Sequence, residues 1–176
     1  MRVMDDGGVG DEALEEGNED QALFLPGRSP LTVVELTPAT LDDRLRAWRL
    51  AHPTWAVVRL RGRRCRETPG LFAEAAAALQ FPSWFGENWD AFADCLSDLS
   101  WLPARGYLLV LDGADQLLAG NPQDLETLRA VLVETAEVWA DHQAALPDGT
   151  AGPVPFSSLL VSPPGTGAAT VRRLAL

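Results

Sequence analysis

Three aspartates recur at four-residue intervals in the stretch GENWDAFADCLSD, and their spacing defines a candidate site. At about 100° per residue, Asp90, Asp94 and Asp98 fall on one side of a helix. The opposite side carries apolar residues: Trp89, Phe92, Ala93, Leu96 and Leu99. A row of carboxylates could perform acid–base catalysis, hold a divalent cation or bind a cationic partner, although a solvated polar face is the commonest meaning of such a pattern.

Two features of this stretch favour a partner-binding role. Like charges four residues apart cost a few tenths of a kcal/mol per pair, and no arginine lies between residues 67 and 104 to offset them. Trp84 and Phe85 precede a glycine turn and place large aromatic side chains beside these charges. Aromatic residues next to unpaired charges are typical of protein-binding surfaces.

The same acids leave an enzymatic alternative open. Asp90, Asp94 and Glu134 could hold a divalent cation in a metal-dependent hydrolase. Against this, an exposed helix face lacks the apolar enclosure that raises the pKa of a carboxyl group for acid catalysis. His52 and His142 have no companions at metal-ligand spacing. We therefore expect neither an enzyme nor a metal or cofactor site.

The elements that must position these residues alternate along the chain. From apolar periodicity and turn signals we expect four strands and four helices. The strands are expected at 31–36, 54–60, 107–113 and 156–162, and the helices at 41–51, 68–80, 88–99 and 124–142. Thr68 and Asn88 are the expected N-caps of two helices. This alternation predicts an α/β fold with a mostly parallel sheet covered by helices.

Charge is concentrated at the start of the chain. Residues 1–20 hold eight acids against Arg2, which is −7 of the net charge of −11 and leaves −4 for the rest. Composition and periodicity together predict four parts: a disordered acidic tail and linker at 1–30, a folded domain at 31–165, an additional β-α unit within it at 31–53, and a C-terminal segment at 166–176.

The acidic balance also limits the partners. Nucleic-acid affinity requires a basic footprint, so we expect no direct nucleic-acid binding, and anionic membranes are disfavoured for the same reason. The chain starts without an apolar leader, which indicates a cytoplasmic protein. These patterns make no prediction of oligomeric state.

Two motifs were weighed as alternatives. PPGTGAAT at 163–170 is similar to a nucleotide-binding loop, but Ala168 stands at the lysine position, and we expect an irregular end without strand-to-helix context. The basic stretch RLRGRRCR at 59–66 could suggest RNA binding, but it is better explained as a strand end and a turn whose arginines face solvent or acidic helices.

The stretch FPSWFGENWDAFADCLSDL resembles the signature of the barstar family of ribonuclease inhibitors. That family combines an aromatic pair, Gly-Glu-Asn, an aliphatic residue, Asp-Ala and Asp-Cys-Leu at this spacing. The matching positions are Trp84, Phe85, Gly86, Glu87, Asn88, Asp90, Ala91, Asp94, Cys95 and Leu96. The element order over 54–162 is also similar. The resemblance therefore implies a small barstar-like fold, with a parallel sheet of three to four strands packed with helices.

The resemblance also implies a function. Such a protein would be a stoichiometric inhibitor that blocks the active site of a secreted, guanyl-specific microbial ribonuclease. Asp94 would be the central anchor in the enzyme's phosphate site, and Asp90 a flanking acid. The other partner-binding residues that the resemblance implies are Trp84, Phe85, Gly86, Asn88 and Glu134.

Three departures from the family pattern bear on the target. Trp84 and Phe85 stand where tyrosines are common, Trp89 replaces an aliphatic residue, and Ala93 replaces a tryptophan. These changes bear on the identity of the target enzyme more than on the mode of binding. They leave open an interaction or immunity module for a non-ribonuclease partner.

Overall fold

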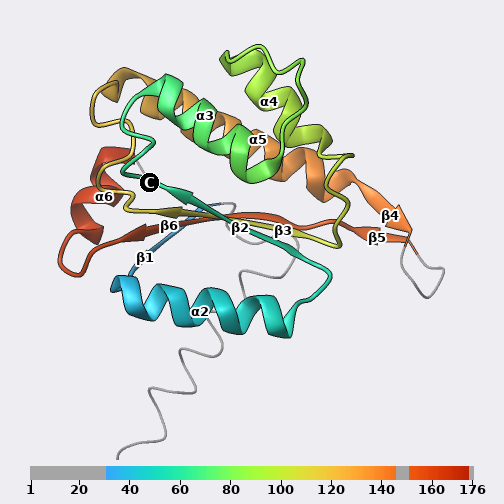
Figure 1. The fold of residues 1–176 in the computed structure, drawn as a ribbon, viewed down its shortest axis with the longest axis horizontal. Coiled ribbons are helices and arrows are strands. Elements are labelled where there is room, and N and C mark those ends of the chain that lie inside the picture. The colour runs from blue at the N-terminus through green and yellow to red at the C-terminus, as the bar shows by residue number, and fades with distance from the viewer. Residues whose placement is uncertain (1–30, 146–150, 175–176) are drawn as a thin grey trace, which may run out of the picture.

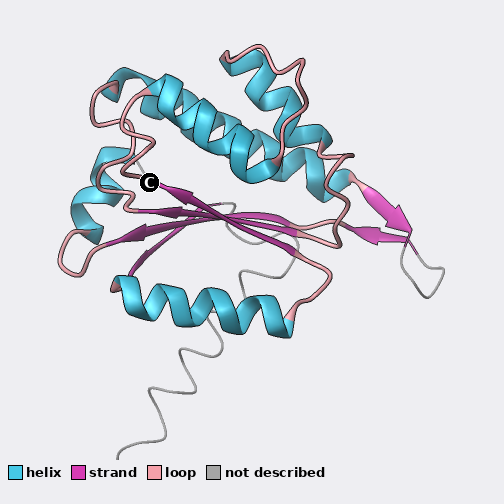
Figure 2. Ribbon diagram, viewed as in Figure 1, coloured by secondary structure: helices cyan, strands magenta, loops and turns pink. Residues whose placement is uncertain are grey.

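The computed structural model describes residues 31–145 and 151–174, so the predicted acidic tail lies outside the described residues. A four-stranded sheet forms the centre of the molecule (Figures 1 and 2). Its strands, in spatial order, are β1 (Leu31–Glu35), β6 (Phe156–Ser162), β3 (Tyr107–Asp112) and β2 (Ala56–Arg61). All three neighbouring pairs are parallel. The predicted α/β fold with a parallel sheet of three to four strands is thus confirmed.

Helices cover the two faces of the sheet unequally, as Figure 1 shows. Among the described helices, α2 (Pro38–Ala51) is the one below the sheet. Above it lie α3 (Thr68–Leu79), α4 (Trp89–Asp98) and α5 (Leu125–Asp141), the last preceded by the 3-10 turn η1 (Pro122–Asp124). A short helix, α6 (Gly167–Leu174), packs against β1, β6 and α5.

The helix α2 begins where its sequence provides a cap. The Thr37 side chain accepts a hydrogen bond from the Thr40 amide at 3.2 Å, and Pro38 occupies the first turn, where its missing N–H costs nothing. Its apolar stripe, Leu41, Leu45 and Trp48, packs against the lower face of the sheet. That face is formed by Val57, Leu108, Val110, Leu159 and Val161.

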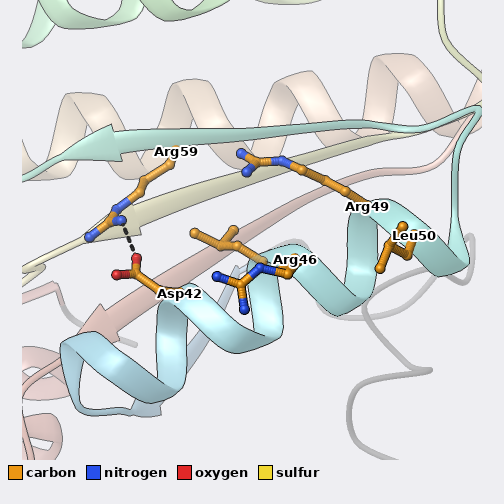
Figure 3. Close-up of a pocket in the computed structure, with 6 residues that line it drawn as sticks. Asp42, Arg46, Arg49, Leu50 and Arg59 are labelled. Carbon is orange, nitrogen blue, oxygen red and sulfur yellow. Dashed lines mark hydrogen bonds and ion pairs between the residues drawn. The ribbon is translucent and has the colours of Figure 1, made fainter.

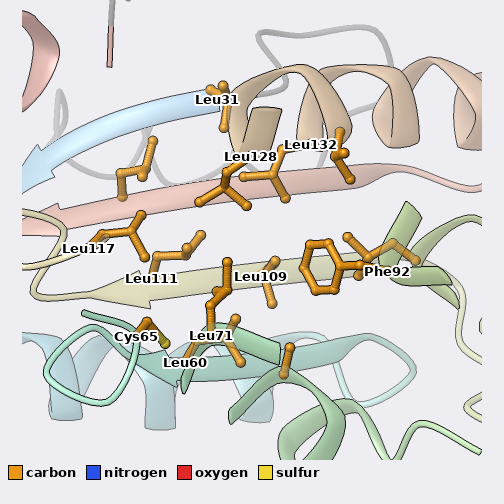
Figure 4. Packing of buried hydrophobic residues seen from close by; sticks show 14 of the residues in the cluster. Leu31, Leu60, Cys65, Leu71, Phe92, Leu109, Leu111, Leu117, Leu128 and Leu132 are labelled. Carbon is orange, nitrogen blue, oxygen red and sulfur yellow. The ribbon is translucent and has the colours of Figure 1, made fainter. Parts of the chain in front are cut away.

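The larger core lies between the sheet and the upper helices (Figure 4). Figure 4 shows Leu109 and Leu111 of β3 facing Leu128 and Leu132 of α5, with Phe92 of α4 closing one end. Each of these side chains is at most 2% exposed. Burial of a large apolar side chain contributes about 1.5–3 kcal/mol relative to exposure, so this layer fixes the upper helices on the sheet.

The edge strand β2 is protected by side chains from both neighbouring helices. The Arg49 guanidinium of α2 donates to the Val57 carbonyl, and the Glu74 carboxylate of α3 accepts from the Arg61 amide at 3.2 Å. Figure 3 shows Arg59 reaching down from β2 to Asp42 of α2, where the ion pair is 2.7 Å. These contacts occupy polar groups that an open sheet edge would otherwise offer to another chain.

Three local expectations differ from the structure. Glu67, in extended conformation, is the N-cap of α3, so Thr68 is the first helical residue and its hydroxyl donates to Asp124 instead. The end of the chain is not irregular, because α6 follows the turn after β6. A short antiparallel pair, β4 (Gln143–Ala145) and β5 (Ala151–Pro153), was also not expected.

Candidate functional site

The helix α4 begins at the predicted N-cap. The Asn88 side-chain oxygen accepts from the Ala91 amide at 2.9 Å, and its side-chain nitrogen donates to the Gly86 carbonyl at 3.2 Å. The intervening Glu87 has a positive φ of 49°, which non-glycine residues adopt uncommonly. The side chain of Asn88 therefore closes the turn onto the helix, and its bonding groups are used within the chain.

The inner face of α4 anchors the helix. Phe92, Leu96 and Leu99 are fully buried, as the periodicity predicts, and Trp89 and Ala93 pack on the core from half-buried positions. The neighbouring helix α5 adds a polar tie, because the Trp139 indole N–H donates to the Leu96 carbonyl at 2.8 Å. The opposite face is consequently presented on a fixed element.

That opposite face carries the three aspartates. Asp90, Asp94 and Asp98 are exposed, and none of them forms an ion pair with another residue in the described part of the chain. Their field reaches the inner face: burial raises the pKa of the Cys95 thiol, and the charges of Asp94 and Asp98 raise it further. The three aspartates on this face of α4 thus form an acidic column whose negative charge is not balanced by a cationic partner within the described residues.

The loop before α4 partly buries one of its two aromatic side chains and exposes the other. Phe85 is half-buried and packs edge-on against Phe72 and Phe81, with ring centroids 5.9 and 4.9 Å apart. Trp84 is 61% exposed and meets the edge of Trp101 at 6.0 Å. The inner ring therefore fixes the loop, and the outer ring remains accessible.

Trp101 is a member of this surface that the sequence analysis did not identify. It is half-buried, and its indole N–H donates to the Leu79 carbonyl at 3.0 Å, which orients the ring that supports Trp84. An isolated tryptophan after the helix has no local pattern that assigns it to the loop. The contact brings together residues 17 positions apart, which only the fold reveals.

The two remaining predicted residues lie in the loop before α4 and on α5. Gly86 is exposed, and a side chain there would bring its Cβ to 3.0 Å from the Asn88 side-chain nitrogen, so the cap favours glycine at this position. Glu134 is exposed on α5, the helix that packs beside α4. The structure thus collects six predicted residues on one loop and one helix, and the seventh on the adjacent helix.

Within 31–145 and 151–174, no three His, Cys, Asp or Glu side chains are grouped as metal ligands. Both cysteines are buried and free, and burial raises the pKa of the Cys65 thiol to about 12, with Glu74 adding to this effect and Arg61 opposing it. No helix in the described part of the chain is both long and apolar enough to cross a membrane.

Shallow grooves occur elsewhere, along the edge strand β2. One of about 430 Å³ lies between α2 and β2 and is lined by Asp42, Leu45, Arg46, Arg49, Leu50 and Arg59 (Figure 3). Another, of about 320 Å³, lies at the carboxyl ends of β2 and β3. In these grooves Arg59 and Arg61 form ion pairs with Asp42, Asp112 and Glu74, and Arg49 donates to the Val57 carbonyl.

Comparison with known proteins gives one structural likeness and one family match. In a solved structure of the ORC2 protein of Aeropyrum pernix in ADPNP-ADP complexes, the superposition has a TM-score of 0.55 and 16% sequence identity. It covers 92% of this chain and 42% of that chain, so the present chain spans less than half of that protein, and the likeness shows the fold alone. No curated protein matches this chain significantly.

The second comparison concerns sequence families. Residues 55–147, more than half of the chain, match the family described as Barstar (barnase inhibitor). The match contains the aromatic loop, α4 and α5, and it excludes β1, α2, β6 and α6. The chain therefore belongs to the barstar family.

Proposed function

We propose that this protein is a stoichiometric inhibitor of a microbial, extracellular-type guanyl-specific ribonuclease, acting inside the cell that produces the enzyme. The observation that carries the proposal is the pairing of charge and exposure on α4. Asp90 and Asp94 lie one turn apart, are exposed, and have no ion-pair partner within the described residues. The loop that leads into α4 carries the accessible ring of Trp84.

The charge of these residues suits such a target. A ribonuclease holds the phosphate of its substrate with cationic side chains, and a carboxylate offers similar charge and acceptor oxygens without a scissile bond. Asp94 would enter this phosphate site, and Asp90 would bind cationic groups beside it. Because α4 is anchored by Phe92, Leu96 and the Trp139 contact, little conformational entropy is lost when the carboxylates bind.

The aromatic loop would supply the apolar part of the contact. Trp84 offers a large ring that Trp101 already orients, and buried aromatic anchors dominate many protein interfaces. Gly86 would let the partner approach the backbone, and Glu134 would extend the acidic surface onto α5. Asn88 would act through the turn, since its side chain bonds within the chain.

A second candidate rests on the aromatic chemistry of this loop. Neither Trp84 nor Phe85 has the phenolic hydroxyl common at these positions in the family, and Phe85 packs inward. A partner whose binding depends on hydrogen bonds to those hydroxyl groups would bind this surface more weakly. The same surface could therefore serve as an immunity or interaction module for a cationic toxin other than a ribonuclease.

An inhibition panel tests the proposal. The full chain is titrated against several microbial guanyl-specific ribonucleases, and we expect activity on RNA to reach its minimum at one equivalent for at least one of them. A guanosine 3′-phosphate ligand should compete with the inhibitor, because both occupy the phosphate site. Absence of inhibition across the whole panel would favour the second candidate, and inhibition that the nucleotide does not relieve would contradict binding at the phosphate site.

A further inference from the structure

The turn after β6 holds an acidic side chain from the other end of the described chain. One carboxylate oxygen of Glu35 accepts from the Gly165 amide at 2.8 Å, and the other accepts from the Gly167 amide at 2.6 Å. Gly165 has a positive φ of 83°, which turns its N–H toward the carboxylate. The two bonds hold the pKa of Glu35 below its usual range, so the group is ionised at neutral pH.

The contact lies at the carboxyl ends of β1 and β6, and Glu35 is exposed there. β1 continues into α2 on one face, whereas β6 continues into α6, which packs beside α5 on the other face. Neighbouring parallel strands whose connections diverge in this way leave a crevice at their carboxyl ends, where open α/β sheets usually bind ligands. Amides at the start of a helix favour an anion there.

The Glu35 side chain packs closely against Gly167 at the start of α6. A Cβ added to Gly167 would come within 2.6 Å of the Glu35 carboxylate oxygen and 2.9 Å of its Cγ. The turn itself has the loop-like sequence PPGTG, but Ala168 follows where a phosphate-binding loop would have lysine. The carboxylate thus supplies negative charge at a position where no lysine is present to help hold an external phosphate.

The rest of α6 is tied to the same edge. The Ser162 hydroxyl at the end of β6 donates to the Thr170 hydroxyl at 2.8 Å, and both residues are buried. Arg173 donates to the Ala114 carbonyl beyond β3. The helix therefore contacts the ends of three strands, and Glu35 provides the tie to β1.

We propose that Glu35 is a built-in anion that occupies the phosphate position of this turn and latches α6 to β1 across the carboxyl end of the sheet. The latch joins two segments that both lie outside the family match at 55–147. It gives the P-loop-like turn a ligand from the same chain, so that the Gly165 and Gly167 amides already have an acceptor in the folded protein. This proposal does not depend on ribonuclease inhibition.

Amide hydrogen exchange in the full chain tests the latch. The variants are Glu35→Ala and Glu35→Gln, and Glu137→Gln is the matched control because Glu137 is an exposed acid on α5. We expect Glu35→Ala to accelerate exchange of the Gly165 and Gly167 amides at least about tenfold, since both lose their acceptor. Glu35→Gln should have an intermediate effect, because its amide oxygen accepts without charge. The control should leave both rates unchanged.

Inorganic phosphate provides the second arm. Added to Glu35→Ala, it should restore protection of the two amides, and it should leave the exchange rates of the wild-type chain unchanged. Unaltered exchange in the Glu35 variants would overturn the latch. The absence of a phosphate response in Glu35→Ala, or an equal response in wild type, would overturn the assignment of Glu35 as an internal anion. If Glu35→Ala does not fold, exchange in Glu35→Gln decides between the latch and its absence.

Discussion

The acidic face of α4 and the arginine-rich strand β2 are both strongly charged, but they use their charges in opposite ways. On β2, Arg59 pairs with Asp42 and Asp112, and Arg61 pairs with Glu74 at 2.6 Å. On α4, Asp90 and Asp94 have no such partner in the described part of the chain. Charge that is matched internally stabilises the fold, whereas unmatched charge on a fixed helix is available to a partner.

The contrast separates two properties that a mutation can change. A substitution on β2 or its partners should alter the free energy of unfolding and leave binding intact. A substitution on the exposed face of α4 should alter the binding affinity and leave the free energy of unfolding unchanged. The difference between the two kinds of variant can therefore be measured.

The largest effect is expected for Asp94→Ala. If Asp94 enters the phosphate site of a ribonuclease, its removal leaves cationic groups of the enzyme desolvated and unpaired, at a cost of about 2–5 kcal/mol in binding free energy. Asp98→Ala is the matched control, one turn further along the same exposed face, and should change affinity by less than about threefold. Isothermal titration of each variant against the inhibited enzyme measures the difference. Equal losses for both variants would contradict the assigned anchor.

Glu74→Gln should destabilise the fold. Glu74 is 5% exposed, and its carboxylate binds both the Arg61 side chain and the Arg61 amide. Replacing it should lower the free energy of unfolding by about 1–3 kcal/mol, because the guanidinium of Arg61 loses a buried, negatively charged hydrogen-bond acceptor. Asp43→Asn, which breaks the exposed pair with Arg46, should cost less than about 1 kcal/mol. Urea denaturation compares the two, and inhibition should be the same for both variants.

Ionic strength should affect binding more than folding. Raising salt from about 0.01 M to about 1 M shortens the screening length from about 30 Å to about 3 Å. The association rate constant with a cationic ribonuclease should then fall at least about tenfold, because exposed acids on α4 steer the encounter. Stopped-flow fluorescence measures this rate, and the thermal midpoint of the chain alone serves as the reference. An association rate constant that does not change with salt would contradict an electrostatic role for the acids of α4.

The pH dependence of stability should reveal the matched charge. Burial alone would raise the pKa of Glu74, but its bonds to Arg61 and the charges of Arg61 and Arg64 outweigh burial and lower it. Since its pKa in the folded state is below the unfolded value, this stabilisation is present above the ordinary pKa of 4.5 and is lost as pH falls through the folded pKa. Urea denaturation at several pH values should therefore show the gap between wild type and Glu74→Gln narrowing below pH 4.5. A constant gap would contradict it.

Sequence patterns predicted the features that arise from nearby residues. The cap at Asn88, the buried stripe of Phe92 and Leu96, and the bounds of β6 at 156–162 agree with the structure. Each depends on periodicity or on a hydrogen bond across three residues. The exposure of Asp90 and Asp94 follows from the same periodicity, because the apolar stripe settles which side of α4 faces inward.

The features that could not be predicted depend on distant residues. The helix α6 starts at amides that bind a carboxylate 130 and 132 positions away, so its local sequence carries only the glycine-rich turn. Thr68 looks like a cap, but its hydroxyl bonds to Asp124, 56 positions away, and Glu67 takes the capping position. The support that Trp101 gives to Trp84 is likewise visible only when the loop is folded.

The position of α2 below the sheet determines which shortened versions of this protein can fold. A fragment cut to the family-matched residues 55–147 would lack β1, α2 and β6. The apolar side chains of Val57, Leu108 and Val110 would then be exposed to solvent. The strand β3 would become an edge strand with unpaired backbone N–H and C=O groups. Recombinant production of that fragment should yield inclusion bodies, and the shortest well-behaved chain must keep the parts that sequence similarity leaves out.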